Sequence, residues 1–358
     1  MNRILIVSHA PLAAEAGAGQ VALQLSDALR ALGNKVSLWS PHPLSSALHW
    51  WENLTLVREK LNSYLTAQQN FDIIDAPANL ITRQVRAKGR MIVARSTQPQ
   101  LLYLLEEINY PIHRNIWGIL QILSRSLFFG ATLLLNLWGW NRADFILCLG
   151  SLEKEWMKKR FPWYKTKIVS YFNAPSKGDQ LQFAEIRKHR KGLSEFGGVR
   201  FLWMGRWRPH KGCRELVNFI TSRSSSCPED VFTIAGSGPE AEKDCPLELS
   251  RSGRLKVIPS FSRDELYHLL ATHDAGLFTS RVEGWGLSLN EMLESGMVVF
   301  ATNTGGVPDL RPFFKETLRS FPPPEEIELP KSSSPPEAYF DKFSWEKIAQ
   351  SYMNSISA

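Results

Sequence analysis

The stretch Thr279-Ser-Arg-Val-Glu-Gly-Trp-Gly-Leu-Ser-Leu-Asn-Glu291 places two carboxylates on either side of a glycine-bearing turn. Glu283 precedes the turn, and Glu291 follows eight positions later, inside a segment (288–294) that predicts a short helix. The backbone amides at the start of such a helix lack intrahelical partners and attract an anion. The turn would contribute the amides of Gly284, Trp285, Gly286 and Leu287. Carboxylates accept hydrogen bonds from sugar hydroxyl groups, and free backbone amides bind a phosphate. The combination therefore suits a sugar nucleotide as ligand.

A buried strand and a second glycine pair follow this turn, with Val298–Ala301 as the strand and Gly305 and Gly306 as the pair. The block resembles the retaining glycosyltransferases of family 4, whose signature is a Glu, seven residues and a second Glu, then a strand and a Gly-Gly loop. In that family the first Glu contacts the donor sugar and the second binds the ribose. The resemblance implies these roles for Glu283 and Glu291, with the glycine pair beside the donor.

A cationic loop, Gly205-Arg-Trp-Arg-Pro-His-Lys-Gly212, follows the first strand of the second half. It is similar to the family loop whose Arg and Lys hold the donor diphosphate, which implies that role for Arg206 and Lys211. A guanidinium and an ammonium would stabilise the charge that develops on the leaving diphosphate. We expect Arg208 and His210 to face solvent.

Two further glycine turns match the family pattern. Gly236 follows a strand and lies near the nucleotide base in the family, whereas Gly17 and Gly19 open the first helix near the acceptor. A purely structural turn explains Gly17 and Gly19 equally well. A dinucleotide dehydrogenase is disfavoured, because no Gly-x-Gly-x-x-Gly occurs there and no acidic residue closes the second strand.

The sequence departs from the family where a His usually contacts the donor sugar, because it has Arg95-Ser-Thr-Gln98 instead. Three replacements are open: a hydroxyl from Ser96 or Thr97, or the imidazole of His113.

Short apolar runs alternate with amphipathic ones along the chain, which is typical of parallel sheets. We expect an α/β protein of GT-B architecture, with two Rossmann-like doubly wound domains facing a cleft. Residues 1–172 would form the acceptor-side domain, residues 173–342 the nucleotide-sugar domain, and the closing helix (343–358) would pack back on the first. A basic stretch, 173–198, is expected to be a linker. The expected strands are 4–8, 35–39, 71–74, 90–94, 145–149 and 168–171, then 200–204, 231–235, 255–258, 275–278 and 298–301.

The composition is that of an ordinary globular protein, with 358 residues, 44% hydrophobic and 22% charged. Its formal charge of +7 suits a nucleoside diphosphate or an anionic membrane surface, and no nucleic-acid module is recognisable. Four cysteines without paired spacing are typical of reduced thiols in a cytoplasmic protein, and they indicate no metal site.

The segment between Ile108 and Ala143 contains no acidic residue. Within it, 16 uncharged residues lie between Arg125 and Arg142, and as a helix they would extend about 24 Å, short of a bilayer core. Two interpretations are open: a core helix, or a peripheral face that places Trp138 and Trp140 at lipid headgroups. The nearby cations that would favour anionic lipid are Lys158, Lys159, Arg160, Lys165 and Lys167.

The resemblance implies a metal-independent, retaining transferase of the hexosyl type, with a nucleoside-diphosphate sugar as donor substrate and no separate cofactor. The acceptor would be a saccharide or a lipid-linked saccharide, as in polysaccharide biosynthesis. No Asp-x-Asp motif of the metal-using transferases occurs. Two alternatives remain: a catalytically impaired sugar-nucleotide binder at the membrane, and a nucleotide-sugar hydrolase or epimerase of the same fold.

Overall fold

The computed structural model describes residues 1–12, 17–42, 44, 50–109, 116–190, 197–329 and 334–357. Contacts between Cα atoms divide the chain into two units. Unit 1 comprises Met1–Asn173 and Phe343–Ala358, and unit 2 comprises Ala174–Lys342. Each unit contains a six-stranded sheet whose neighbouring strands are all parallel.

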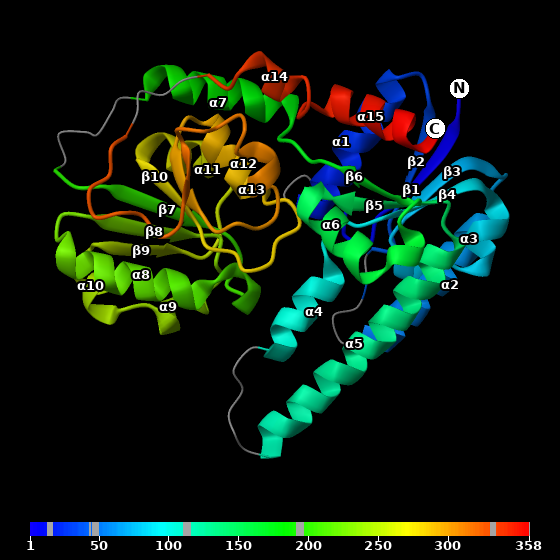
Figure 1. The fold of residues 1–358 in the computed structure, drawn as a ribbon, viewed down its shortest axis with the longest axis horizontal. Helices are drawn as coiled ribbons and strands as arrows, with labels where there is room; N and C mark the ends of the chain where they lie inside the picture. The colour runs from blue at the N-terminus through cyan, green and yellow to red at the C-terminus, as the bar shows by residue number, and fades with distance from the viewer. Residues whose placement is uncertain are drawn as a thin grey trace. The chain divides into compact units, whose positions relative to one another are not determined.

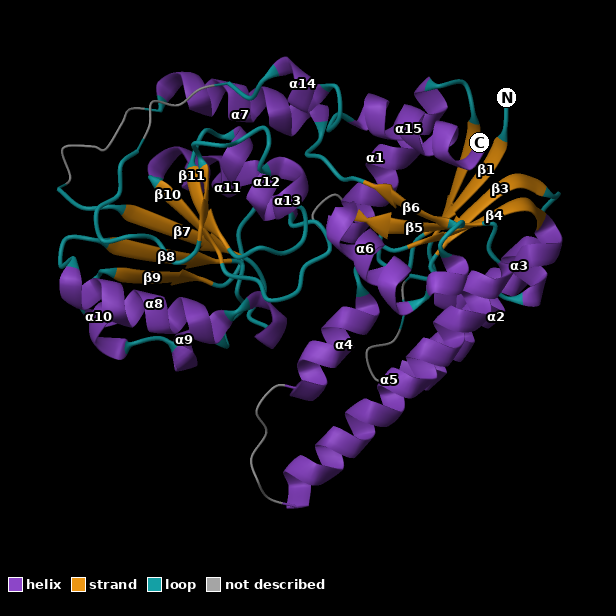
Figure 2. Cartoon of the chain, viewed as in Figure 1, coloured by secondary structure: helices purple, strands orange, loops and turns teal. Residues whose placement is uncertain are grey.

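The sheet of unit 1 has the order β2-β1-β3-β4-β5-β6, and helices flank it (Figures 1 and 2). Its strands are nearly continuous apolar runs, as expected for a parallel sheet covered on both faces. The strands are β1 (Arg3–Val7), β2 (Lys35–Trp39), β3 (Phe71–Ala76), β4 (Gly89–Arg95), β5 (Phe145–Leu149) and β6 (Ile168–Tyr171). The helices are α1 (Gly17–Ala31), α2 (Trp50–Thr66), η1 (Ala78–Leu80), α3 (Arg83–Lys88), α4 (Gln100–Asn109), α5 (Ile116–Arg142), α6 (Gly150–Arg160), η2 (Pro162–Tyr164) and α15 (Trp345–Ser357).

The sheet of unit 2 has the order β12-β11-β10-β7-β8-β9. The strands are β7 (Arg200–Met204), β8 (Val231–Ala235), β9 (Leu255–Ile258), β10 (Ala275–Phe278), β11 (Val298–Ala301) and β12 (Leu318–Ser320). The helices are α7 (Lys177–His189), η3 (Pro209–Lys211), α8 (Cys213–Ser226), α9 (Ala241–Asp244), α10 (Leu247–Arg251), α11 (Arg263–Thr272), α12 (Leu287–Glu294), α13 (Val307–Leu310) and α14 (Glu337–Phe340). The order reverses between β7 and β10, so the loops after these two strands flank the switch point of a doubly wound sheet.

The predicted α/β class with two parallel sheets is confirmed, and most predicted strands have the observed bounds. The predicted linker is wrong, because α7 occupies much of 173–198. Ser176 and Asp179 form a capping box that begins this helix. The helix α6 begins at Gly150, with Leu149 at the cap position.

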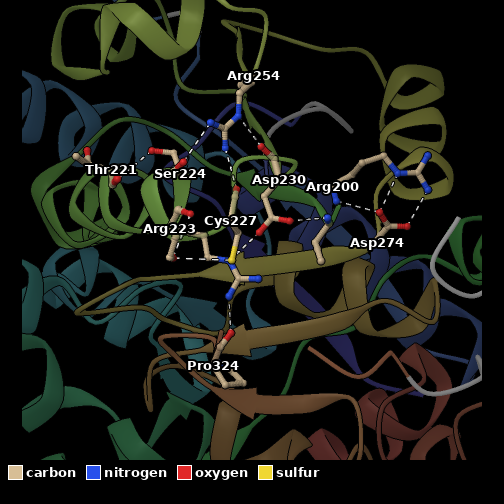
Figure 3. A network of polar contacts seen from close by, with 11 residues as sticks. Arg200, Thr221, Arg223, Ser224, Cys227, Asp230, Arg254, Asp274 and Pro324 are labelled. Atoms are coloured by element: carbon tan, nitrogen blue, oxygen red, sulfur yellow. Dashed lines mark hydrogen bonds and ion pairs between the residues drawn. The ribbon is translucent and has the colours of Figure 1, made fainter. Parts of the chain in front are cut away.

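A polar network ties together the amino ends of the strands in unit 2 (Figure 3). Asp230 accepts a hydrogen bond of 2.7 Å from Arg223 Nε, and both side chains are buried. Asp274 accepts two from the Arg200 guanidinium, at 2.8 and 2.7 Å. The Val199 amide also donates to Asp230 Oδ1 at 2.7 Å, so these contacts join the starts of β7, β8 and β10 at the edge opposite the loops that follow the strands.

The apolar helix α5 spans 27 residues, longer than the 16-residue stretch predicted, and extends well past the sheet of unit 1 (Figure 1). By length and composition, its portion Leu120–Arg142 could cross a membrane, and 11% of an apolar stretch of 18 residues within this portion is buried. The half nearer the sheet packs on the core through Phe129, Leu133 and Leu137. Trp140 is buried there, so its predicted place at lipid headgroups is wrong, whereas Trp138 is exposed.

We predict that Gly139→Ala destabilises unit 1, because a Cβ at Gly139 would lie 1.9 Å from the backbone oxygen of Ala78. Forcing α5 away from η1 should cost about 1–3 kcal/mol and lower the melting temperature. Gly130→Ala is the matched control on the same helix, since nothing lies within 4 Å of its Cβ position. It should leave stability unchanged or raise it by about 1 kcal/mol. Equal melting temperatures for the two variants in calorimetry would contradict the proposed close packing.

Candidate functional site

The loops that follow the central strands of unit 2 are hydrogen-bonded to one another. The Arg281 amide donates to His210 O at 2.8 Å, which joins the loops after β10 and β7. The Gly306 amide donates to Trp285 O at 2.9 Å, which joins the loops after β11 and β10. The carboxyl edge of a parallel sheet at its switch point is where ligands of such folds bind. These loops therefore form the candidate site of unit 2.

A partly buried ion pair between Lys211 and Glu283 lies at this switch point. The Lys211 ammonium donates to Glu283 Oε2, and Ser280 Oγ donates to the same oxygen at 3.3 Å. The Gly284 amide donates to Oε1 at 3.2 Å. The side chains of the pair are 20% and 10% exposed, respectively. The structure thus brings together two of the predicted site residues from separate loops.

Glu283 remains ionised despite its burial. Removal from water acts to raise the pKa of its carboxyl, but the charge and hydrogen bond of Lys211 outweigh that effect, with help from His210 and the Gly284 amide. The pKa of Glu283 therefore lies below its ordinary value of 4.5. At neutral pH Glu283 is therefore a carboxylate.

The glycines of the two turns are required by close packing within the protein. Gly286 has a φ of +88°, and a Cβ there would lie 2.6 Å from the Phe278 ring. Gly305 has a φ of +56°, and its Cβ would lie 3.0 Å from the Glu283 side chain. A Cβ on Gly306 would meet the buried Trp285 ring at 2.9 Å. The second glycine loop thus rests on the first and holds Glu283 in place.

The second predicted carboxylate, Glu291, is buried in α12 and pairs with Arg263, which sequence reasoning missed. Arg263 NH1 donates to Glu291 Oε1 at 2.8 Å, and its Nε donates to Asp179 Oδ1 at 2.8 Å. Burial raises the pKa of Glu291, and the charge of Arg263 opposes that shift. The Ser176-x-x-Asp179 capping pattern was the signal that could have placed Asp179 on a helix.

The other cations of the loop after β7 have different environments. Arg206 is exposed, and none of the ion pairs among the described residues involves it. Arg208 is exposed, as predicted. His210 is half-buried rather than solvent-facing, and burial together with Lys211 lowers its pKa to about 4. Gly236, in the loop after β8, has a φ of +73° and lies against the Phe261 ring.

In the segment Arg95-Ser-Thr-Gln98, the Arg95 guanidinium belongs to a buried ion pair, in which its Nε donates to Asp75 Oδ1 at 2.7 Å. Ser96 Oγ donates to Glu153 Oε1 at 2.7 Å, and Thr97 Oγ1 lies 3.4 Å from His9 Nδ1. His113, the third replacement, lies outside the described residues.

The two glycines of the first turn lie at the start of α1. Gly17 is exposed and Gly19 is buried. Over the described parts of both units, no group of three or more His, Cys, Asp or Glu could hold a metal ion.

Comparisons with known proteins agree with this geometry. The family model described as glycosyl transferases group 1 matches residues 185–311, all within unit 2. An uncharacterised glycosyltransferase, YqgM of Bacillus subtilis, is 29% identical over 115 residues, which cover 31% of this chain and 32% of YqgM. The GPI3 subunit of a phosphatidylinositol N-acetylglucosaminyltransferase of Saccharomyces cerevisiae is 22% identical over 210 residues, which cover 56% of this chain and 46% of that subunit. The chain thus spans less than half the length of these curated relatives.

The solved structure of Anabaena HepE in complex with UDP-glucose has a TM-score of 0.60 and 16% identity, with full coverage of both chains. The fold is therefore GT-B, built from two Rossmann-like units. Together these similarities support a function in sugar transfer.

We predict that the stability lost in Glu283→Gln depends on pH. Because the pKa of Glu283 is lowered in the folded protein, its pairing with Lys211 stabilises the fold above the ordinary value of 4.5, and the effect is lost as pH falls through the folded pKa. The variant should be roughly 1–3 kcal/mol less stable at pH 7, and this deficit should shrink as the pH is lowered from 4.5 to 3.

Denaturant unfolding at both pH values measures this difference. Glu185→Gln serves as control, because Glu185 belongs to an exposed ion pair, and it should change little at either pH. A deficit of the same size at pH 3 and pH 7 would show that Glu283 does not act through its charge.

Proposed function

We propose that the protein is a glycosyltransferase that moves a hexose from a nucleoside-diphosphate sugar to a saccharide or a lipid-linked saccharide, with retention of configuration and without a metal. Unit 2 binds the donor, and unit 1 with its C-terminal helix binds the acceptor. The observation that carries this proposal is the contact of Lys211 with Glu283 at the switch point of unit 2, within the segment that matches the glycosyltransferase model.

Each predicted site residue has a role in this proposal. Lys211 and Arg206 bind the diphosphate, Glu283 binds the donor sugar, and Glu291 binds the ribose. The amides of the turn from Gly284 to Leu287 complete the anion site. In the structure Lys211 and Arg263 already neutralise the two carboxylates, so a diphosphate would share Lys211 with Glu283. Gly236, Gly305 and Gly306 would line the donor pocket, and Gly17 and Gly19 would lie on the acceptor side.

The chemistry follows from charge. Breaking the bond between the sugar and the diphosphate leaves positive charge on the ring and negative charge on the leaving group. Lys211 stabilises the leaving diphosphate, and the Glu283 carboxylate stabilises the positive ring. The diphosphate then accepts the proton of the attacking hydroxyl on the same face of the sugar, which retains the configuration. These two side chains therefore supply both signs of charge that the transition state requires.

Two of the similar proteins support the substrates. HepE was solved with UDP-glucose, which supports a nucleoside-diphosphate sugar as donor. The yeast relative is named for transfer to phosphatidylinositol, which supports a lipid-linked acceptor.

One observation favours a second candidate, a sugar-nucleotide binder without turnover. Arg95 occupies the region of the family's His, is buried, and is engaged with Asp75. Its guanidinium therefore does not replace that imidazole beside a donor. A hydrolase or epimerase of the same fold is separated from a transferase by a product assay that requires the acceptor.

We predict that Lys211→Met weakens binding of the donor at least tenfold and that Glu283→Ala abolishes transfer in a folded protein. The first change removes a charged hydrogen bond to the diphosphate, and the second removes the carboxylate from the ring. Calorimetric titration with UDP-, GDP- and ADP-glucose measures binding, and product formation measures transfer. Arg208→Met is the control in the same loop and should bind like the wild type. Full activity in Glu283→Ala would refute the proposal.

We also propose that unit 1 binds the cytoplasmic face of an anionic membrane through α5. Along this helix the exposed large apolar side chains are Leu120, Ile122, Leu123, Leu127, Leu134 and Trp138. All of these except Ile122 lie on one face of the helix, within about 60° of one another at 100° per residue, and such an exposed apolar stripe is typical of a helix that lies at a membrane interface. Arg125 and Arg142 lie on the helix and no acidic residue does, which suits anionic headgroups. The core-packed half of α5 limits insertion to the half farther from the sheet.

We predict that the double variant Leu123→Glu, Leu127→Glu no longer floats with vesicles containing phosphatidylglycerol, whereas the wild type does. Two carboxylates would have to enter the interfacial region and face anionic lipid. The control is Leu181→Glu, Leu247→Glu, which changes two equally exposed leucines of unit 2 and should float like the wild type. The membrane assignment is contradicted if the Leu123→Glu, Leu127→Glu variant floats like the control. It is also contradicted if the wild type self-associates with rising concentration but does not float.

A further inference from the structure

Unit 1 contains a cavity of about 150 Å³ at the carboxyl ends of β4 and β5. Its walls come from the loop that follows β4, from residues beside η1, and from α5 and α6. A cavity of this volume accommodates a single six-membered ring. Every residue that lines the cavity belongs to unit 1.

Asn136 is the first sign that the cavity takes a ligand. It is 7% exposed, lines the cavity, and its amide has no hydrogen-bond partner within the part of the chain that the structure describes. Its polar atoms are not among the fully buried unpaired atoms of the described residues, so the amide has access to the open space of the cavity. The same helix uses apolar residues for its packing on the core, so packing alone does not require an amide here. A polar group inside the cavity would satisfy it.

Glu153 provides a second polar group from another element, α6. It is 8% exposed and lines the cavity. Ser96 Oγ donates to its Oε1 at 2.7 Å, and the Leu149 amide donates to its Oε2. These two bonds hold the carboxyl in position, and each carboxyl oxygen keeps a lone pair that can accept from a hydroxyl group.

The remaining walls match an uncharged ring. Trp140 and Trp156 line the cavity and provide broad apolar surfaces. Arg95 is the only Lys or Arg among the lining residues, and Asp75 neutralises it at 2.7 Å. The NH1 and NH2 nitrogens of Arg95 have no partner among the described residues, so they can also donate to hydroxyl groups of a ligand. Hydroxyl groups suit an amide and a carboxyl, and the carbon faces of a sugar suit indole rings.

We propose that this cavity binds one neutral sugar ring, with its hydroxyls on Asn136 and Glu153 and its carbon faces on Trp140 and Trp156. The inference rests on the proposed function, because it makes this ring the sugar residue of the acceptor. Asn136 and Glu153 would thus be residues that determine acceptor specificity.

The test uses the full chain and Asn136→Leu, which replaces the amide with an apolar side chain of similar size. Saturation-transfer NMR and calorimetry measure binding of the methyl glycosides of glucose, galactose, mannose and N-acetylglucosamine. We expect the wild type to bind at least one of them and the variant to bind it at least tenfold more weakly, without a lower melting temperature. Gln121→Leu, on the exposed part of α5, should bind like the wild type. Glu153→Gln is the second variant and should also weaken binding.

Binding of UDP-glucose to the same variants separates the two proposals, because Asn136→Leu should leave donor affinity unchanged. If transfer is seen, the variant should raise the KM for the acceptor and leave that for the donor as it was. The inference is overturned if no glycoside binds the wild type, or if Asn136→Leu binds as well as the wild type. Loss of glycoside binding with unchanged acceptor KM would overturn the acceptor assignment. Failure of the donor site would instead appear as unchanged donor binding in Lys211→Met.

Discussion

The pairing of Lys211 with Glu283 is the interaction on which the site of unit 2 depends. Each charge lies largely out of water, where an unpaired charge would be costly, and each satisfies the other. The pair also fixes the protonation state of the carboxylate, whose pKa stays below its ordinary value although burial acts against ionisation. A ligand that carries phosphate must therefore compete for an ammonium that the protein already uses.

Backbone packing makes this pairing possible. The loops after β7, β10 and β11 can meet only because glycines stand where side chains would collide, as at Gly212, whose Cβ would lie 2.0 Å from the Thr279 backbone oxygen. The ion pairs at the opposite edge of the sheet, of which Arg223–Asp230 is buried, hold the strands from which these loops emerge. Rigid strands and tightly packed loops thus fix the backbone positions of Lys211 and Glu283, and the side chains themselves complete the ion pair.

Unit 1 also contains a parallel six-stranded sheet, but its buried ion pair has a structural role. Its most buried charges, Arg95 and Asp75, face each other, and Tyr352 of α15 donates to Asp75 at 3.0 Å. This network ties the C-terminal helix to the sheet of unit 1. The polar groups that remain beside open space lie on the cavity between the loop after β4 and the two helices α5 and α6. In the proposals above, the ion pair of Lys211 and Glu283 in unit 2 would act on the donor, and Asn136 and Glu153 in unit 1 would bind the acceptor sugar.

Local patterns in the sequence were sufficient to predict the strands, because buried parallel strands are short apolar runs bounded by turn residues, as in Arg200–Met204 and Val298–Ala301. They also located Glu283, Lys211 and the glycine turns. The helix α7 was missed because its charged, half-exposed residues lack a clear apolar stripe, and only the Ser176–Asp179 capping box marks its start.

What the sequence by itself determined is the set of elements and the residue types at their ends, since these depend on neighbours along the chain. The tertiary structure alone decided which side chains contact one another. Arg263 joins Asp179 of α7 to Glu291 of α12, and Asn136 and Glu153 reach one cavity from different helices. Such contacts depend on which distant segments the folded sheet brings together, and the spacing of residues along the chain does not specify this.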